Sequence, residues 1–340
     1  MPTQSPLRWG LLSTANINQP VIAALRASLR NSLVAVASRD EAKAKAYAAQ
    51  WQIKKAFGSY EAMLASPDVD VVYISLPNSL HAEWAIKALN AGKHVLCEKP
   101  LANTVEDVDA MFAAAQANNK VLAEAFMYRH HPQTLAVKDL ITSGAIGPIR
   151  LIRGAFSFPI GDEADIRLNP NLGGGSIWDV GCYPISYART LIGAEPTEVY
   201  GAAMLGKSGV DDTFAGLMRW QDVVSGRDSG RDIIAQFDSS LRAPFRTHME
   251  IVGSNGLITI PQPFKPGAKA EIMIGESFDK FETVVIEGPE HLYLGEIEDM
   301  ADAVLEGKPS RITHEDSRNN VKTIQALLRS ATAHLRIAMR

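Results

Sequence analysis

The chain has 340 residues, of which 46% are hydrophobic and 21% are charged, and its formal net charge is −4. This size and composition indicate a globular protein of two domains. The small negative charge gives no reason to expect nucleic acid or an anionic membrane as a partner, and no apolar run approaches the roughly 18 residues of a membrane span. The N-terminal segment lacks the basic and apolar regions of a signal peptide, and two cysteines are too few for a disulfide framework, so we expect a cytoplasmic protein.

The first third of the chain alternates short apolar runs with helix-like segments. Strands are expected at residues 7–12, 33–37, 69–74, 94–97 and 121–123. Helices are expected at 17–29, 41–50 and 82–89, and another is expected to begin at Thr104. Strands separated by helices form right-handed βαβ units, which predict a doubly wound parallel sheet of the Rossmann type. Ligands of such sheets bind beyond the carboxyl ends of the strands.

A respaced glycine motif follows the first expected strand, at residues 10–15. Ser13 stands where the second glycine of a dinucleotide-binding motif belongs, and that glycine normally lets the backbone approach the pyrophosphate. The match is weak by itself, but its position between a strand and a helix favours a dinucleotide site. The cofactor contacts predicted in this segment are Gly10, Ser13, Thr14, Ala15, Asn16 and Ile17.

The second expected strand ends at Ser38-Arg39-Asp40, where a dinucleotide enzyme recognises the adenosine ribose. Serine and arginine suit the 2′-phosphate of NADP, because a guanidinium pairs with phosphate and a carboxylate repels it. Asp40 is a rival ligand for the ribose, but it also occupies the N-cap position of the next helix. We favour the cap, and therefore NADP with Ser38 and Arg39 as contacts.

Two further segments follow buried strands and are expected to face the cofactor. They contribute Leu76, Pro77, Asn78 and His81, and then Glu98 and Lys99. We interpret His81 as a helix-start or cofactor-packing residue rather than a catalytic base. The plain alternative for Lys99 is an exposed loop lysine.

A glycine-rich stretch, residues 173–183, is the most distinctive segment of the second half. Asp179 and Tyr183 are four residues apart, so in a helix they share one face. Pro184 predicts either a kink or a helix that begins near Tyr183 with the proline in its first turn. A purely structural glycine loop is the plain alternative.

The remainder predicts a second α/β domain, with the boundary placed between residues 1–126 and 127–340. Neighbouring strands with short turns imply an open, mostly antiparallel sheet. Strands are expected at residues 149–158, 198–204, 214–220, 233–239, 246–251 and 257–260, with a hairpin at 253–256. Helices are expected at 135–142, 296–305 and 318–338, and a polar turn at 225–232.

Five segments together resemble the Gfo/Idh/MocA family, which is named for glucose-fructose oxidoreductase, inositol dehydrogenase and relatives. They are residues 10–15, 76–81, 98–100, 124–129 and 173–183. Many relatives carry histidine where this chain has Tyr183. Tyrosine there, with Ser13 and Arg39, resembles the branch of NADP-dependent D-xylose and other aldose 1-dehydrogenases, dihydrodiol dehydrogenase and glucose-fructose oxidoreductase. The resemblance implies an open sheet in the second domain that joins subunits into a dimer or tetramer, and it adds Arg129 to the cofactor contacts.

The resemblance also implies that Tyr183 and Lys99 are the catalytic pair. A free tyrosine has a pKa near 10, so its ionisation at pH 7 costs roughly 4 kcal/mol. One cation at about 4 Å supplies about 4 kcal/mol at an effective dielectric constant of about 20. Asp179 is expected to bind a substrate hydroxyl or to hold Lys99 protonated, and the alternative is a carboxylate at a helix N-terminus. No metal is expected.

The resulting hypothesis is NADP-dependent oxidation of an aldopyranose at C1 to its lactone. A reductase of a sugar-derived ketone or dicarbonyl, an aldose-aldose oxidoreductase with tightly bound NADP and a non-catalytic NADPH sensor are the rivals, the sensor last. Substrate contacts are expected just before the glycine run, and the alternative for the two aromatic residues among them is strand core. These contacts are Phe156, Phe158, Arg167 and Asn169.

Overall fold

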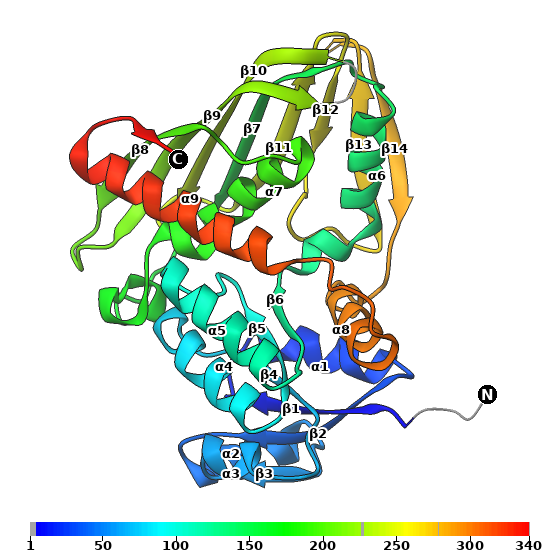
Figure 1. Cartoon of the computed structure of the whole chain (residues 1–340), viewed down its shortest axis with the longest axis vertical. Helices are drawn as coiled ribbons and strands as arrows, with labels where there is room; N and C mark the ends of the chain where they lie inside the picture. Colours follow the sequence, from blue (N-terminus) through cyan, green and yellow to red (C-terminus); the bar gives the residue numbers. More distant parts are fainter. Residues whose placement is uncertain (1–4, 226–227, 278, 340) are drawn as a thin grey trace. The chain divides into compact units, whose positions relative to one another are not determined.

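The computed structural model describes residues 5–225, 228–277 and 279–339. The chain forms two compact units, whose elements are labelled in Figure 1. The first unit contains the chain up to His130 together with His291–Arg318, and the second contains His131–Glu290 and the chain from Asn319 onward. The C-terminal part of the chain therefore contributes to both units.

The first unit is built on a parallel sheet. Within the described residues its strands pair in the order β3-β2-β1-β4-β5-β6, and every pair is parallel. The strands are β1 (Leu7–Leu12), β2 (Asn31–Ala37), β3 (Lys55–Phe57), β4 (Val71–Ile74), β5 (His94–Glu98) and β6 (Leu122–Ala125). The helices are α1 (Asn18–Ala27), α2 (Glu41–Gln50), α3 (Tyr60–Leu64), α4 (His81–Asn90), α5 (Val105–Ala117) and α8 (Leu294–Glu306).

The strand order reverses between β1 and β4, and this positions the loops that follow them. Connections run one way from β1 through β2 to β3 and the other way from β4 through β5 to β6. Right-handed crossovers place the helices of the two halves on opposite faces of the sheet. The loops after β1 and β4 diverge at the reversal, which is where ligands of such sheets bind. The predicted doubly wound sheet is confirmed.

Local sequence explains most boundaries of the first unit. The predicted cap at Asp40 is confirmed, because its carboxylate accepts a hydrogen bond from the Lys43 amide. Thr104 caps α5 in the same way, by accepting from the amide of Asp107. Strand β3 and helix α3 were not predicted, since three and five residues are too few to show a hydrophobic period.

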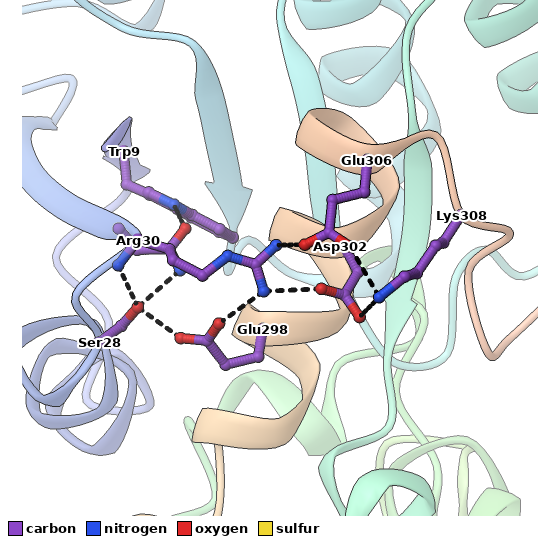
Figure 2. Close-up of polar contacts among 8 residues, drawn as sticks. Trp9, Ser28, Arg30, Glu298, Asp302, Glu306 and Lys308 are labelled. Carbon is purple, nitrogen blue, oxygen red and sulfur yellow. Dashed lines mark hydrogen bonds and ion pairs between the residues drawn. The ribbon is translucent and has the colours of Figure 1, made fainter. Parts of the chain in front are cut away.

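An ion-pair network attaches α8 to the sheet of the first unit (Figure 2). The guanidinium of Arg30, just before β2, lies 2.6 Å from the Asp302 carboxylate and 2.9 Å from that of Glu306. Arg30 also pairs with Glu298, and Lys308 pairs with Asp302 and Glu306. A guanidinium shared among several carboxylates holds α8 more firmly than isolated surface pairs do.

The same network continues into the core (Figure 2). Ser28 donates to Glu298, Asn31 donates to Ser28 at 2.9 Å, and the fully buried Trp9 indole donates to Asn31 at 2.7 Å. The carboxylates of α8 are thus linked to a β1 side chain through uncharged donors.

The second unit is built on a mostly antiparallel sheet. Its strands pair in the order β14-β13-β12-β11-β7-β10-β9-β8-β15, and among the described strands only β7 and β10 pair in parallel. The strands are β7 (Ile149–Ser157), β8 (Glu198–Leu205), β9 (Asp211–Ser225), β10 (Asp228–Ser240), β11 (Arg246–Gly253), β12 (Leu257–Ile260), β13 (Lys269–Gly275), β14 (Phe281–Glu287) and β15 (Ile337–Ala338). The helices are α6 (Pro132–Thr142), α7 (Cys182–Ile192) and the part of α9 (His314–Ala333) that follows Arg318.

Helices α6 and α7 and this part of α9 cover one face of the second sheet (Figure 1). On α9, Ser330 accepts from the amide of Gly201 in β8 at 3.0 Å. A Cβ on Gly201 would lie 2.5 Å from the carbonyl oxygen of Leu327, so only glycine permits this close packing. The predicted open antiparallel sheet is confirmed.

Two sequence expectations for the second unit need correction, and two of its strands were missed. The polar turn expected at 225–232 is wrong over most of its length, because β10 begins at Asp228; residues 226 and 227 lie outside the described chain. Strands β13 and β14 were not predicted. The last helix was expected at 318–338, but α9 spans His314–Ala333 and β15 follows it.

Both cysteines, Cys97 and Cys182, are fully buried, and neither forms a disulfide. No helix in the described part of the chain is both long and apolar enough to cross a membrane.

Candidate active site

The glycine-motif loop of the first unit is held by a buried polar network. Ser13 has φ of +138°, a backbone conformation that favours glycine, and its hydroxyl lies 2.7 Å from that of Ser75. Ser75 donates to the Asn18 side-chain oxygen at 2.7 Å, and the Asn18 amide donates to the Ser13 carbonyl at 2.9 Å. The Ser13 hydroxyl also accepts from the Ala15 amide at 3.1 Å. These bonds stabilise a serine in the conformation of the missing glycine.

Ser75 and Asn18 are two site residues that the sequence interpretation missed. Both are buried polar residues, and each lies at the end of a regular element: Ser75 follows β4 and Asn18 begins α1. That position was the available signal, since polar side chains directly after buried parallel strands gather at one edge of the sheet.

The other residues of the motif have different surroundings. Gly10 serves packing, because a Cβ there would lie 2.8 Å from the Met63 sulfur of α3. Thr14, Ala15 and Ile17 are partly exposed and Asn16 is exposed. No side chain caps α1, and its first turn holds no acidic residue, so the positive end of its dipole is left available to an anion.

The residues after β2 are those predicted to recognise the 2′-phosphate of NADP. Arg39 is exposed, and it lies beside Tyr60, where it opposes the rise that burial causes in the Tyr60 pKa. The Asp40 carboxylate bonds to the Lys43 amide, and the Asp40 amide donates to the Ser38 hydroxyl. Asp40 is therefore engaged in capping, while Arg39 is exposed beside Tyr60.

His81 links the loops that follow β4 and β5. Its Nδ1 lies 2.9 Å from the carbonyl oxygen of Pro100, and its Nε2 lies 2.8 Å from that of Leu76. The side chain is fully buried, and burial lowers its pKa. Both ring nitrogens thus face backbone carbonyls within the first unit. Pro77 and Asn78 are partly exposed beside it.

In the motif Glu98-Lys99-Pro100, Glu98 is the last residue of β5, and Lys99 and Pro100 follow the strand. The hydroxyl of the buried Tyr73 donates to the Glu98 carboxylate, and burial raises the Tyr73 pKa well above its usual value. Lys99 is partly exposed. Arg129, the remaining cofactor residue expected in the first unit, is buried and pairs with Asp316 at 2.8 Å.

In the second unit, Asp211 holds the glycine turn. This buried carboxylate accepts from the Ser176 hydroxyl at 2.7 Å and from the Ile177 amide at 2.8 Å. Gly175 has φ of +125°, and a Cβ there would lie 2.3 Å from Asp211 Oδ1. Burial raises the pKa of Asp211 to about 6, against the hydrogen bonds that lower it. The sequence interpretation missed Asp211, because it follows the turn by more than thirty residues.

A π-helical turn, Ile177–Gly181, joins this glycine turn to α7. Helix α7 begins at Cys182, so Tyr183 and Pro184 lie in its first turn, as one of the two predicted alternatives required. The wider turn avoids the clash that a proline makes with the carbonyl four residues earlier in a regular helix.

Asp179, on the π-helical turn, pairs with a residue predicted for the substrate site. Arg167 Nε lies 3.1 Å from Asp179 Oδ2, and Arg167 Nη1 lies 3.2 Å from Asp165. The Arg167 guanidinium also lies 5.8 Å from the Phe158 ring centroid. The Asn169 side chain caps a short turn by accepting from the Asn171 amide at 2.9 Å. The structure thus brings Arg167, Asp179 and Phe158 together.

The Tyr183 ring packs among aromatic side chains of the second sheet. Its centroid lies 5.3 Å from that of Phe156 and 5.4 Å from that of Phe264. The Phe156 ring stacks on that of Phe264, with their centroids 5.3 Å apart, and the exposed Phe245 makes an edge contact with Phe156. Phe156 is buried core, whereas Phe158 is partly exposed. Phe264 and Phe245 come from distant loops, so the sequence offered no signal for them.

Comparison with known proteins identifies both halves of the chain. Residues 7–126 match the family model "Oxidoreductase family, NAD-binding Rossmann fold", and residues 134–259 match the "GFO/IDH/MocA C-terminal domain". The chain belongs to the Gfo/Idh/MocA family of oxidoreductases. The resemblance inferred from the motifs is confirmed.

Similar proteins act on sugars or sugar derivatives. A D-xylose 1-dehydrogenase (NADP(+)) of Haloferax volcanii is 37% identical, over 96% of this chain and 97% of its own. The 3-ketoreductase KijD10 of Actinomadura kijaniata, solved with NADP and TDP-benzene, is 32% identical with a TM-score of 0.87, over 96% and 98% of the two chains. The aldose-aldose oxidoreductase of Caulobacter crescentus, solved with glycerol, is 25% identical with a TM-score of 0.87, over 98% and 100%.

We predict that Gly175→Ala destabilises the second unit by at least about 3 kcal/mol, because a methyl group must displace the buried Asp211 carboxylate. Gly193→Ala is the matched control: Gly193 also has positive φ, at +71°, but no atom lies within 4 Å of its added Cβ. Strain alone makes that change cost roughly 1–2 kcal/mol. Urea unfolding of both variants measures the difference, and equal losses would contradict the role given to Asp211.

Proposed function

We propose that this oxidoreductase transfers hydride from C1 of an aldopyranose of the D-xylose or D-glucose type to NADP⁺, giving an aldonolactone. The observation that carries the proposal is that the chain holds both an exposed Arg39, beside a capping Asp40, in the first unit and a tyrosine, Tyr183, packed among aromatic rings in the second. The Haloferax relative bears the name of this reaction with D-xylose.

The cofactor is NADP. Arg39 offers a guanidinium to a 2′-phosphate, and the adjacent carboxylate, Asp40, is engaged with the Lys43 amide. The loop at Ser13 and the uncapped start of α1 suit a pyrophosphate. NADP supplies the hydride acceptor, and the chain must orient the sugar and move one proton.

Tyr183 serves as the base in this proposal. The C1–H bond is broken with its electron pair leaving as hydride, and the proton of the C1 hydroxyl passes to the Tyr183 oxygen as the carbonyl forms. The proposal gives Lys99 the role of offsetting the cost of the tyrosinate, which is roughly 4 kcal/mol at pH 7. A cation at about 4 Å would supply about that much at an effective dielectric constant of about 20. Tyr183 is buried against Phe156 and Phe264, so water is excluded from its ring.

Asp179 and Arg167 contact the sugar hydroxyls in this proposal. Their ion pair presents both acceptors and donors, and the partly exposed Phe158 beside Arg167 offers an apolar face to the ring. Asn169 exposes its amide group nearby in sequence, although its side-chain oxygen is used locally.

A second candidate is reduction of a sugar-derived ketone or dicarbonyl with NADPH, with Tyr183 as the proton donor. The similarity to a 3-ketoreductase solved with NADP favours it. The third is an aldose-aldose oxidoreductase that keeps NADP bound through both half-reactions, favoured by the Caulobacter relative. A non-catalytic NADPH sensor has no specific support.

We also infer that the chain forms a homo-oligomer through the uncovered face of the second sheet. A hollow of about 450 Å³ lies on this face, lined by residues of β7 to β11 that include Tyr200, Leu217 and His248. Tyr200 is 45% exposed, and Met204 and Leu205, on the same strand, are more exposed still. An apolar face of this kind is typical of subunit contacts.

We predict that Arg39→Ala weakens NADP binding by about 10- to 100-fold and leaves NAD binding within about twofold, because only NADP carries the 2′-phosphate. Lys43→Ala removes an exposed cation from the same helix start and is the control. Titration of nucleotide fluorescence measures the affinities. Equal losses for the two cofactors would reject the phosphate assignment.

We predict that Tyr183→Phe lowers kcat by on the order of 10²–10⁴ while NADPH affinity is unchanged. Tyr187→Phe makes the same change four residues later on α7, at a fully buried position, and is expected to retain turnover. Steady-state rates with D-xylose and D-glucose provide the measurement. Unchanged turnover in the first variant eliminates Tyr183 as the base.

We predict that Tyr200→Glu shifts the oligomer to smaller species, because a charge on this face must be desolvated on association. Leu29→Glu is the control, since Leu29 is 94% exposed and lies in the first unit. Sedimentation of the purified full chain measures the effect, and an unchanged distribution contradicts the assignment of this face.

A further inference from the structure

A buried carboxylate bonds directly to the loop that carries Lys99. Glu124 lies on β6, opposite Cys97 of β5, and is 2% exposed. Its Oε1 accepts from the Leu101 amide at 2.9 Å, and its Oε2 accepts from the Ser317 hydroxyl at 2.6 Å. Leu101 and Ser317 are themselves buried. All of these residues belong to the first unit.

Two buried side chains therefore hold the backbone just after Lys99. His81 contacts the carbonyl of Pro100, the residue after Lys99, and Glu124 accepts from the amide of the next residue, Leu101. Each contact is to the backbone, so it restrains the path of the chain rather than the Lys99 side chain directly. A catalytic side chain that must be placed to within a fraction of an ångström depends on such restraints.

We propose that Glu124 is a positioning residue for Lys99, acting through the Leu101 amide. The inference rests on the proposed role of Lys99. The carboxylate does not contact the reacting atoms in this account. It fixes the loop that presents the lysine, and Ser317 completes its hydrogen bonding.

A carboxylate differs from a neutral amide at this position. When ionised, Glu124 accepts both hydrogen bonds with charge assistance, which makes each about twice as strong as its neutral equivalent. When protonated, it becomes a donor at one oxygen. The Ser317 hydroxyl can rotate to accept, but the Leu101 N–H can only donate. Protonation therefore weakens the restraint on the loop.

Glu124 changes its protonation state near neutral pH. Burial raises its pKa to about 7, against the lowering effect of the Ser317 hydrogen bond. The other titratable or charged groups that face it are Cys97 on β5, Arg129 in the turn after β6 and Asp316 at the start of α9. Arg129 pairs with Asp316, so the two charges partly cancel.

Hydrogen exchange of the Leu101 amide tests the restraint without reference to activity. In the full-length protein, Glu124→Gln is expected to speed Leu101 exchange about tenfold above pH 8, after correction for intrinsic rates, because a charge-assisted bond is replaced by a neutral one. Below pH 6 the two proteins are expected to exchange at similar rates, since Glu124 is then protonated. Equal protection at both pH values overturns the proposal.

Turnover provides the second readout. Glu124→Gln is expected to lower kcat about tenfold at pH 8, with KM and NADPH affinity within about twofold, and to remove the kcat limb centred near pH 7. Ser317→Ala is expected to move that limb to higher pH, because it removes a bond that favours the ionised form. If Glu124 had a merely structural role, neither variant would change the position of this limb.

Glu296→Gln is the matched control. Glu296 is a fully buried glutamate on α8 of the same unit, with no hydrogen bond to its carboxyl group among the described residues. Burial raises its pKa well above the usual value, so an amide resembles its protonated state. Glu296→Gln is therefore expected to leave both the Leu101 exchange rate and the pH profile of kcat unchanged. If Glu124→Gln alters Leu101 exchange but neither it nor the unmodified protein oxidises a sugar, the proposed function is rejected and the Glu124 restraint is retained. If Glu124→Gln changes neither Leu101 exchange nor the pH profile of kcat, the restraint alone is rejected.

Discussion

In each unit, a buried carboxylate accepts a hydrogen bond from the backbone of the loop that carries the proposed chemistry. Asp211 accepts from the Ile177 amide and Glu124 accepts from the Leu101 amide. Loops cannot satisfy their buried N–H groups internally as helices and sheets do, so an unpaired one costs free energy. A carboxylate satisfies such a donor strongly, but its own burial is unfavourable, and the raised pKa values of both groups express that opposition. The shape of both loops depends on these two acceptors.

The two sheets then determine where the loops lie. The reversal of strand order between β1 and β4 gathers the loop at Ser13 with Ser75, and β5 adds the segment containing Lys99. In the second unit, the π-helical turn lets Pro184 enter α7 and presents Asp179 to Arg167. Membership of the Gfo/Idh/MocA family accounts for this combination of a nucleotide-binding sheet with an open antiparallel one.

Local patterns predicted the elements well. Apolar β-branched runs indicated the parallel strands, and Asp40 and Thr104 indicated the starts of α2 and α5. The start of α7 was one of the two alternatives that Pro184 left open. Contacts between residues far apart in the chain could not be predicted from the sequence. The bonds from Glu124 to Ser317 and from Asp211 to Ser176 join residues far apart in the chain, and no period or spacing announces them. No local pattern indicates that His291–Arg318 packs back on the first unit. The ion pair between Arg30 and Asp302 joins residues that only the completed fold brings together.

The functional proposal depends on one reaction. The most direct measurement incubates the full chain and NADP⁺ with D-xylose, D-glucose and other aldoses, and quantifies both NADPH by absorbance and the lactone by chromatography. The account predicts equal amounts of NADPH and aldonolactone from at least one aldopyranose, and formation of both that is slower by on the order of 10²–10⁴ with Tyr183→Phe. Absence of NADPH with every aldose, together with NADPH-dependent reduction of a ketone or dicarbonyl, would contradict it.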